Sequence, residues 1–532
     1  RSERGPLHGC AAASLMKGAA APARMGPLAL ARLLARLAGR LLELAWLYLP
    51  LVLLGVWAAC ADALHLPTSL GVALGLLGEK AKDWRAAWLA RTLRNVQKSG
   101  PVFVKLAQWA ATRPDFVPET WCQALGYLQD RTDPHSLEHT HKILDESFSR
   151  DGWSHAFLIE PEPIGSGCIA QVYRGIAQVP DPDSRPSGPP GAESGCGYGG
   201  LWQLLGGAGP RSSGSSGAGR KGTMRAVPVA VKVIHPQVRR AVDLDLVFLQ
   251  AAAWLVDRLG FESLGVSLAL RQFVGFLSVQ ADFILEANNL IVFRQNFGTG
   301  DNDVAIPKVF HPWVTSDVLV MSFEDGEPLS TLLAAGRARA GDGGGGGEEG
   351  PLPRRSLKKD REEAWGQIVD SFWAMVFKHR FVHGDLHPGN ILWQRRKGRR
   401  PRLVLLDCGL AVDLGGDAGE DLAMMVKAFL TQSEEEVAAL LMRLGERVGG
   451  RLEDVWEPDG FVKGIAELIR EAKGCGFRLG KLNAGALMGR SLLLGRRHRV
   501  RFDARFVNLM VAMTVLQGVA MSLHPEGDFL SR

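Results

Sequence analysis

The residues of this chain that could do chemistry gather in one short stretch, Phe381 to Asn390, and in the strand after it. The stretch reads FVHGDLHPGN, which gives a His-Gly-Asp triplet ending at Asp385, with Asn390 downstream; an apolar run then ends in Asp407, the first residue of Asp-Cys-Gly. Phosphoryl transfer needs a carboxylate beside the acceptor hydroxyl, and an amide and a second carboxylate that hold Mg²⁺ against the phosphates. We assign Asp385 to the first role, and Asn390 and Asp407 to the metal. A polar turn before a buried strand is the alternative, and the coincidence of three spaced features favours the chemistry.

A glycine turn earlier in the chain could approach the same phosphates. The run IGSGCIAQVYRG, from Ile164 to Gly175, is typical of a strand, a tight turn and a second strand. Its two turn glycines carry no Cβ, so backbone N–H groups could come close to a phosphate. A lone Gly-x-Gly is usually just a tight hairpin, and the assignment depends on the strand pattern further along the chain. The candidate nucleotide-binding residues of this run are Ile164, Gly165, Ser166, Gly167, Cys168 and Val172.

The next strand pattern, VPVAVKVIHP, carries Lys232. A lysine on such a strand is the expected partner of the nucleotide phosphates and of a helix glutamate. The helical run ADFILEANNLIVFRQNF supplies Glu286 as the best candidate for that glutamate. A surface lysine on an edge strand and a solvent-facing glutamate are the alternatives, and the order of the motifs favours an ion pair.

The rest of the chain divides around these motifs. Residues 178–226 are rich in Pro, Gly and Ser and are typical of a disordered insertion between two strands. A second flexible linker, residues 335–360, separates an N-terminal lobe (151–334) from a helical C-terminal lobe (361–532).

Composition limits the class of protein. The chain has 532 residues, of which 46% are hydrophobic and 22% charged, so it can bury the cores of two or more domains. The net charge of +6 suits a nucleotide or an anionic membrane surface, and we expect no nucleic-acid partner. The seven cysteines form no C-x-x-C pair, which argues against a zinc site and against a disulfide framework.

The N-terminal part of the sequence predicts that the protein is located at a mitochondrial membrane. Residues 1–40 contain seven basic residues and one acidic residue, with leucines at helical spacing, as in a mitochondrial targeting region; a disordered basic tail or a surface helix is the alternative. In residues 41–66, the run from Leu44 to Ala61 is free of charge and about as long as the minimum for a bilayer span. We predict a transmembrane or membrane-associated helix there, with a buried helix as the alternative. Residues 67–150 are predicted to form a helical extension, in which Lys105 and Gln108 share one helix face.

Together these motifs resemble those of the aarF/UbiB family of atypical kinase-like proteins. The resemblance covers about Val96 to Leu530 and is carried by SGPVFVKLAQWAATRPD, PIGSGCIAQVYRG, VAVKVIHP, QADFILEANNLIVFRQNF, HGDLHPGNI and DCG. It implies an α+β, two-lobed protein-kinase-like fold with an N-terminal helical extension over the active site, and ATP and Mg²⁺ as cofactors. It also implies a role in coenzyme Q biosynthesis and lipid handling. The Gly-Ser-Gly-Cys loop looks most like that of a vertebrate mitochondrial branch of the family.

The resemblance adds two residues to the candidate nucleotide site. In the family, a Lys-x-Gly-Gln signature of the extension points into the nucleotide pocket and hinders protein substrates. Here it falls on Lys105, Leu106, Ala107 and Gln108, so alanine replaces the glycine. The family's Glu-x-Asp pair falls on Gln280 and Asp282, a change that weakens the partner of Lys105.

Three interpretations of function remain open. The first is an ATP-dependent kinase or ATPase, associated with the mitochondrial inner membrane through a single-pass helix, that supports coenzyme Q biosynthesis and lipid homeostasis. Its partners would be mitochondrial membrane lipids and coenzyme Q biosynthesis proteins. The second is a nucleotide-binding scaffold for lipid or quinone intermediates, and the third is a small-molecule phosphotransferase. The absence of an Ala-Pro-Glu segment after Asp407 makes a protein substrate doubtful in all three.

Overall fold

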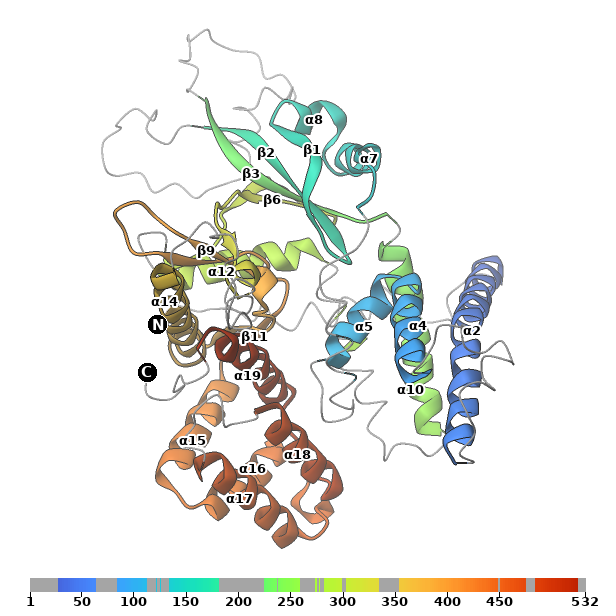
Figure 1. Ribbon diagram of the computed structural model, residues 1–532, viewed down its shortest axis with the longest axis vertical. Coiled ribbons are helices and arrows are strands. Elements are labelled where there is room, and N and C mark those ends of the chain that lie inside the picture. Colours follow the sequence, from blue (N-terminus) through green and yellow to red (C-terminus); the bar gives the residue numbers. More distant parts are fainter. Residues whose placement is uncertain are drawn as a thin grey trace, which may run out of the picture.

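The computed structural model describes residues 27–63, 84–111, 121, 125, 134–180, 224–236, 238–258, 273–274, 277, 282–298, 303–333, 354–447, 450–474 and 484–524. Figure 1 shows an N-terminal lobe built on a sheet, a largely helical C-terminal lobe below it, and a group of helices at one side. The predicted α+β, two-lobed architecture is confirmed.

The N-terminal lobe is built on a five-stranded sheet with the order β1-β2-β3-β6-β5. All its pairings are antiparallel. Its centre is apolar because Val229, Val231 and Val233 alternate along β3 and are all buried. The strands are β1 (Phe157–Ser166), β2 (Ala170–Pro180), β3 (Met224–Ile234), β5 (Val309–Val314) and β6 (Val318–Ser322). Strands β2 and β3 therefore include both ends of the insertion predicted at 178–226, and residues 181–223 lie outside the described residues.

Helix α12 (Phe283–Phe297) packs against β5 and β6. It begins at Asp282, whose side chain accepts a hydrogen bond from Ile284 N at 2.9 Å and caps the first turn. Phe283, Leu290 and Phe293 are buried and fix the rotation of the helix about its axis. Asp282 thus serves as an N-cap, and Gln280 lies outside the described residues.

The C-terminal lobe contains two small sheets. One has the order β4-β10-β9-β7 and the other is the antiparallel pair β11-β8. The strands are β4 (Val304–Ala305), β7 (Glu327–Pro328), β8 (Phe381–His383), β9 (Ile391–Gln394), β10 (Arg402–Leu405) and β11 (Ala411–Asp413). The four-stranded sheet takes β4 and β7 from segments that precede the predicted linker, so the two lobes interleave along the chain.

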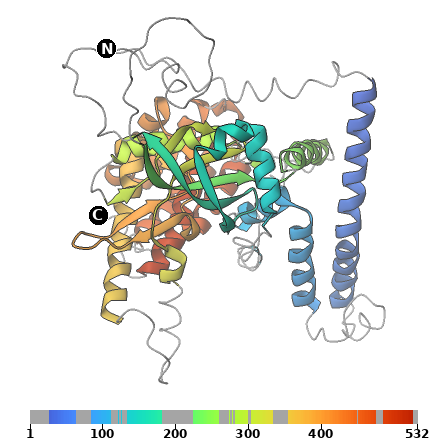
Figure 2. The same cartoon turned by 90° about the horizontal axis from the view of Figure 1, so that it is seen from above.

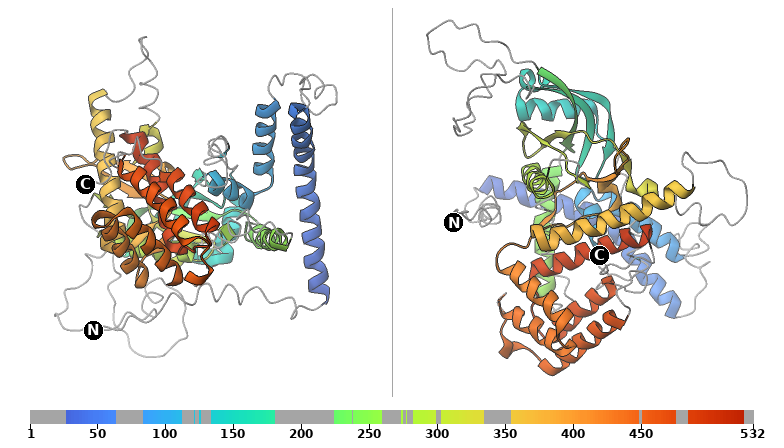
Figure 3. Two further views of the ribbon diagram at one scale, coloured as in Figure 1. Left: turned by 90° about the horizontal axis from the view of Figure 1, so that it is seen from below. Right: turned by 90° about the vertical axis from the view of Figure 1, so that its left-hand side faces the viewer.

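Helices form the remainder of this lobe. Helix α14 (Arg354–Trp373) continues into the π-helix η4 (Ala374–His379) and lies beside α19 (Ala504–Leu523), as Figure 3 shows. The other helices are α15 (Asp417–Thr431), α16 (Glu434–Arg447), α17 (Pro458–Gly474) and α18 (Ala484–Arg497). Among the described residues, one helical segment, Arg505–Leu523, has the length and hydropathy to cross a membrane. Its contacts with α14, α18 and β11 are those of a core helix of this lobe.

The helical extension stands at one side of both lobes (Figure 2). It comprises α2 (Pro27–Ala63), α4 (Trp84–Lys98) and α5 (Pro101–Ala111), which contact one another and α10 (Val238–Arg258). Helix α2 runs without a break across the boundary predicted between residues 40 and 41. The predicted targeting region falls partly outside the described residues, since these begin at residue 27.

Candidate active site

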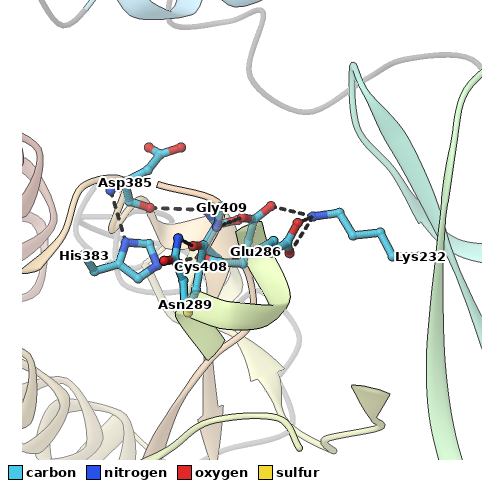
Figure 4. A network of polar contacts seen from close by, with 9 residues as sticks. Lys232, Glu286, Asn289, His383, Asp385, Cys408 and Gly409 are labelled. Carbon is cyan, nitrogen blue, oxygen red and sulfur yellow. Dashed lines mark hydrogen bonds and ion pairs between the residues drawn. The ribbon is translucent and has the colours of Figure 1, made fainter. Parts of the chain in front are cut away.

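The loop after β8 is held by one buried histidine. His383 accepts a hydrogen bond from Asp385 N at its Nδ1 (3.1 Å), and its Nε2 donates to the carbonyl of Asp407 (2.5 Å). A neutral ring protonated at Nε2 satisfies both contacts, and burial lowers the pKa of this imidazole, which favours the neutral form. The backbones of Asp385, the predicted catalytic carboxylate, and Asp407, a predicted metal ligand, are therefore tied to one side chain. The Asp385 carboxylate itself points away from these backbone contacts (Figure 4).

Asn390 completes the loop at the end of the short helix η5 (Pro388–Asn390). Its Nδ2 donates to the carbonyl of Asp385 at 3.1 Å, which leaves the amide oxygen for another partner. Its own carbonyl accepts from Leu406 N at 2.9 Å, next to Asp407. The side chain and the backbone of Asn390 are thus each held by one hydrogen bond to the main chain, next to Asp385 and Asp407.

Lys232 joins the N-terminal lobe to this loop. Its Nζ lies 2.8 Å from Glu286 Oε1 and 2.9 Å from Asp407 Oδ2, while Asp407 Oδ1 accepts from Gly409 N at 2.8 Å. The glutamate is 2% exposed. The predicted ion pair is present, and Lys232 bridges two carboxylates instead of one.

The charges of this trio shift one another's titration. Burial raises the pKa of Glu286 to about 7, the Asp407 carboxylate adds to the rise, and Lys232 opposes it. Burial acts to raise the pKa of Asp407 too, but Lys232 and Gly409 N hold it below its usual range. For Lys232, burial acts to lower the pKa, and the two carboxylates outweigh burial and raise it. One lysine faces two carboxyl groups, so Glu286 is the member that takes up a proton near neutral pH.

We expect the Glu286→Gln variant to gain stability relative to the wild type as the pH rises. The pKa of Glu286 is about 7 in the folded chain and 4.5 in the reference state, so its bound proton stabilises the fold fully below about pH 4.5. That stabilisation is lost as the pH rises to about 7, and glutamine has no proton to lose. In thermal melting of both chains, the melting temperature of the wild type minus that of the variant should fall between about pH 5 and about pH 7.5. A rise over this range would show that the ionised carboxylate stabilises the trio.

The glycine turn has open space at Gly165. An added Cβ on Gly165 would meet no heavy atom within 4 Å, so the turn has room for a phosphate. The Gly167 N–H donates to Ala170 O at 2.8 Å and is taken within the turn. Val172 lies opposite Lys232 in the register of β2 and β3, which brings the predicted loop and the predicted lysine side by side. Ile164 is exposed, and Ser166 and Cys168 are half-buried.

Helix α5 brings Lys105 from the extension to the same place. Burial acts to lower its pKa, but interactions with Cys168, Asp385 and Asp407 outweigh burial and raise it. The ammonium group is therefore close enough to these groups to feel their charge. Gln108 is half-buried one turn further along α5, and its role in the site stays a prediction.

Two residues of the site were given no role by the sequence analysis. Asn289 lies one turn after Glu286 on α12, and its Nδ2 donates to the carbonyl of Cys408 at 2.8 Å (Figure 4). Gly384 packs so closely on Leu410 that an added Cβ would lie 2.4 Å from Leu410 Cδ2. The spacing of Asn289 from Glu286 was a signal for a shared helix face, but a backbone partner leaves no mark in a sequence.

The residues present fit a magnesium nucleotide. Mg²⁺ usually takes one or two protein ligands and completes its shell with waters and phosphate oxygens. Asn390, at the end of the loop after β8, offers an amide oxygen, and Asp407 offers a carboxylate. Within the described part of the chain, no group of three or more His, Cys, Asp or Glu could hold a metal.

The fold is kinase-like, and comparison with known proteins finds a matching family. Residues 221–441 match the family model of the ABC1 atypical kinase-like domain. Lys232, Glu286, Asp385, Asn390 and Asp407 all lie in the segment that is similar to this family. A kinase-like domain implies nucleotide binding.

Relatives with similar sequences include proteins of fungi and bacteria. A mitochondrial ABC1 family protein of Schizosaccharomyces pombe is 26% identical over 485 residues, which cover 84% of this chain and 64% of that protein. A mitochondrial ABC1 family protein of Saccharomyces cerevisiae is 25% identical and covers 92% and 72%, respectively. UbiB of Azotobacter vinelandii, named a probable protein kinase, is 24% identical and covers 81% and 67%. The chain thus spans slightly less than two thirds of the first of these relatives.

Among solved structures, the complex of Rv3197 with erythromycin from Mycobacterium tuberculosis is similar at a TM-score of 0.43 and 18% identity. The match covers 79% of this chain and 86% of that one. At this level of similarity it adds no argument about the site.

Proposed function

We propose that this protein is a Mg²⁺-dependent enzyme that uses ATP, as an atypical kinase or ATPase, and supports coenzyme Q biosynthesis and lipid homeostasis in mitochondria. The observation that supports it most is the set of contacts joining Lys232, Glu286 and Asp407 next to the loop of Asp385. The resemblance to the aarF/UbiB family supports the link to coenzyme Q. The Gly-Ser-Gly-Cys loop supports a place for the protein in the vertebrate mitochondrial branch of that family. The names of the two fungal relatives support a mitochondrial location.

Each residue of the site would carry one part of the chemistry. Lys232, oriented by Glu286, binds phosphate oxygens, and Asn390 and Asp407 hold Mg²⁺, which offsets charge on the transferring phosphoryl group. Asp385 orients the attacking hydroxyl or water and accepts its proton. His383 keeps the backbones of Asp385 and Asp407 in register through its two ring nitrogens.

A direct test is phosphate release or transfer from ATP by the full chain with Mg²⁺ and membrane vesicles. The proposal expects turnover that requires Mg²⁺ and is lost in Asp407→Ala, together with failure of that variant to complement a strain lacking the protein. No turnover, combined with normal complementation by Asp407→Ala, would contradict the proposal.

A nucleotide-binding scaffold is the second candidate, and one observation favours it. Asp407 already has Lys232 as a partner at 2.9 Å, and Lys105 adds positive charge, so a metal must compete with two lysines. If the scaffold interpretation holds, a nucleotide analogue that cannot be hydrolysed should support function as well as ATP does. Detection of a phosphorylated small metabolite would favour a small-molecule phosphotransferase instead.

We further propose that α2 binds the membrane along its surface, in place of a single-pass span. One face of α2 is docked on the protein: Arg40 Nε lies 2.8 Å from Asp245 Oδ1, and Trp88 Nε1 donates to Leu51 O at 2.9 Å. Lipid could not surround the helix along this stretch. On the opposite face, Leu42, Trp46 and Leu49 are 72%, 83% and 56% exposed at a spacing of one and two helical turns.

The charges beside this exposed stripe fit an anionic surface, because Arg32 and Arg36 are exposed on the same helix. We expect Trp46→Ser to weaken binding to vesicles of phosphatidylcholine and cardiolipin by about tenfold. Trp456→Ser removes another exposed tryptophan, 48% exposed in the C-terminal lobe, and should leave binding unchanged. Equal loss in both variants, or in neither, would contradict the assignment of the membrane face to α2.

A further inference from the structure

Behind the glycine turn lies a row of buried polar side chains that the proposed chemistry does not use. They come from the segment that leads into α7 (Leu137–Phe148), from α7 itself, from β2 and from the residue that follows β3. Thr140, Gln171 and Tyr173 have no exposed surface, and His235 has 7%. The row consists of His135, Thr140, Gln171, Tyr173 and His235.

The row ends on the glycine turn itself. His235 Nε2 lies 2.8 Å from the carbonyl oxygen of Gly167, and His235 N donates to Ile169 O at 2.8 Å. A carbonyl can only accept, so Nε2 of His235 carries the proton. The residue three positions after Lys232 therefore fixes the main chain of the turn at two points.

The direction of the remaining hydrogen bonds follows from this end. In the neutral His235 ring Nδ1 is an acceptor, so His135 Nδ1, at 2.7 Å, must donate to it. His135 Nε2 then accepts from the Thr140 hydroxyl at 2.8 Å, and Thr140 accepts from Tyr173 OH at 2.7 Å. Each of the four side chains donates once along the row, toward Gly167.

The far end of the row is anchored by Gln171. Its Nε2 donates to Tyr173 OH and to the carbonyl of His135, and its Oε1 accepts from His135 N at 2.9 Å. Gln171 holds both backbone groups of His135, and this fixes the position from which the His135 ring reaches the His235 ring. The row thus connects β2 to the turn by a path separate from the β1–β2 ladder.

We propose that His235, supported by His135, is a positioning residue of the nucleotide site, which holds the carbonyl of Gly167 and so sets the shape of the turn at Gly165–Cys168 over Lys232. This inference rests on the proposed function, because the shape of the turn matters to activity only if it binds phosphates. Tight turn geometry affects reactivity strongly, since a misplacement of about 1 Å can cost on the order of 100-fold in rate.

The arrangement requires both rings to be neutral. A second proton on His235 would set its Nδ1–H against the Nδ1–H of His135 across 2.7 Å. A second proton on His135 would lie on Nε2, which then could no longer accept from the Thr140 hydroxyl at 2.8 Å. The titratable side chains around the pair are His139 on α7, 5.0 Å from His135 between ring centroids, and Tyr173 on β2. Burial, followed by the neighbouring His235 and His139, lowers the pKa of His135 to about 4, and burial lowers that of His235 as well. The row should therefore keep its direction throughout the neutral range.

Two substitutions at one position separate the bond to the turn from the rest of the row. In His235→Gln the side-chain amide can reach the place of Nε2 and donate to Gly167 O. In His235→Asn the shorter amide reaches only the place of Nδ1 and keeps the contact with His135. Both variants remove an imidazole, so a purely structural role predicts similar effects.

The test measures binding of Mg-ADP and the KM and kcat for ATP in the wild type and both variants of the full chain. His235→Asn should weaken nucleotide binding and raise KM by about tenfold or more, and His235→Gln should stay within a few fold of the wild type. Equal losses in both variants, or no loss in His235→Asn, would overturn the proposal.

Hydrogen exchange of the turn amides in the nucleotide-free chain keeps this test independent of the proposed function. His235→Asn should raise exchange at residues 165–169, and His235→Gln should not. If the wild type binds no nucleotide while exchange follows this pattern, the proposed function fails and the positioning contact stands. Should His235→Asn not fold, Thr140→Val removes the hydroxyl that donates to His135 with little change in shape, and faster exchange is again expected; unchanged exchange would overturn the proposal.

Discussion

Lys232→Met should lower the melting temperature of the nucleotide-free chain by several degrees. The substitution leaves Glu286 and Asp407 side by side without their cation, and Glu286 is almost fully buried. Breaking a buried ion pair costs about 3–5 kcal/mol, and we expect the lower end because the Asp407 side chain keeps 41% of its exposure. Thermal or urea unfolding of the purified chains measures the effect.

Two further variants show whether the loss comes from the unpaired carboxylates. Lys358→Met removes a lysine that is 80% exposed and 3.7 Å from Glu362, and should change stability little. Adding Glu286→Gln to Lys232→Met should restore part of the lost stability, because one carboxylate is removed from the pair. If the stability change of the double variant equals the sum of the changes in the two single variants, the charges of the trio do not stabilise the fold.

Asp385→Asn should reduce turnover of ATP by about 10²- to 10⁴-fold, the usual contribution of a positioned acid or base. The asparagine keeps the size of the side chain, and the contacts that hold the loop use only the backbone N–H and carbonyl of Asp385. Binding of Mg-ADP and the melting temperature should therefore stay close to those of the wild type. Steady-state kinetics and calorimetry measure the two quantities separately.

The opposite pattern would remove Asp385 from the chemistry. If turnover is unchanged, the base or water-positioning group lies elsewhere. If nucleotide binding falls together with turnover, Asp385 acts on the nucleotide and its role as acceptor of the proton is wrong.

Much of this site could be predicted from the sequence because its motifs consist of residue types with few other uses at that spacing. Lys232 and Glu286 form the predicted ion pair, and Asn390 hydrogen-bonds to the carbonyl of Asp385. The second partner of Lys232 was missed, since nothing in the sequence shows that Asp407 lies within 2.9 Å of it. Asn289 and His235 were missed for a related reason: both bind main-chain carbonyls, and a carbonyl is present at every residue.

The fold shows the same limit at its edges. Strands β4 and β7 have two residues each and take part in a sheet only through pairing with β10 and β9. Two residues carry no periodicity, so a boundary set by composition at residues 335–360 could not include them in the C-terminal lobe. The apolar run at Leu44–Ala61 predicted a helix. The face of this helix that docks on the protein could not be predicted, because it is set by contacts with Asp245 and Trp88, which lie elsewhere in the sequence.

The central claim is that Asn390, Asp407 and Lys232 form a site for a magnesium nucleotide. Thermal melting of the full chain with ADP or ATP, with and without Mg²⁺, tests it most directly when the wild type is compared with Asp407→Asn. We predict that nucleotide raises the melting temperature of the wild type more with Mg²⁺ than without it, and that Asp407→Asn loses the Mg²⁺-dependent part. An equal Mg²⁺-dependent rise in both chains, or none in the wild type, would contradict the claim.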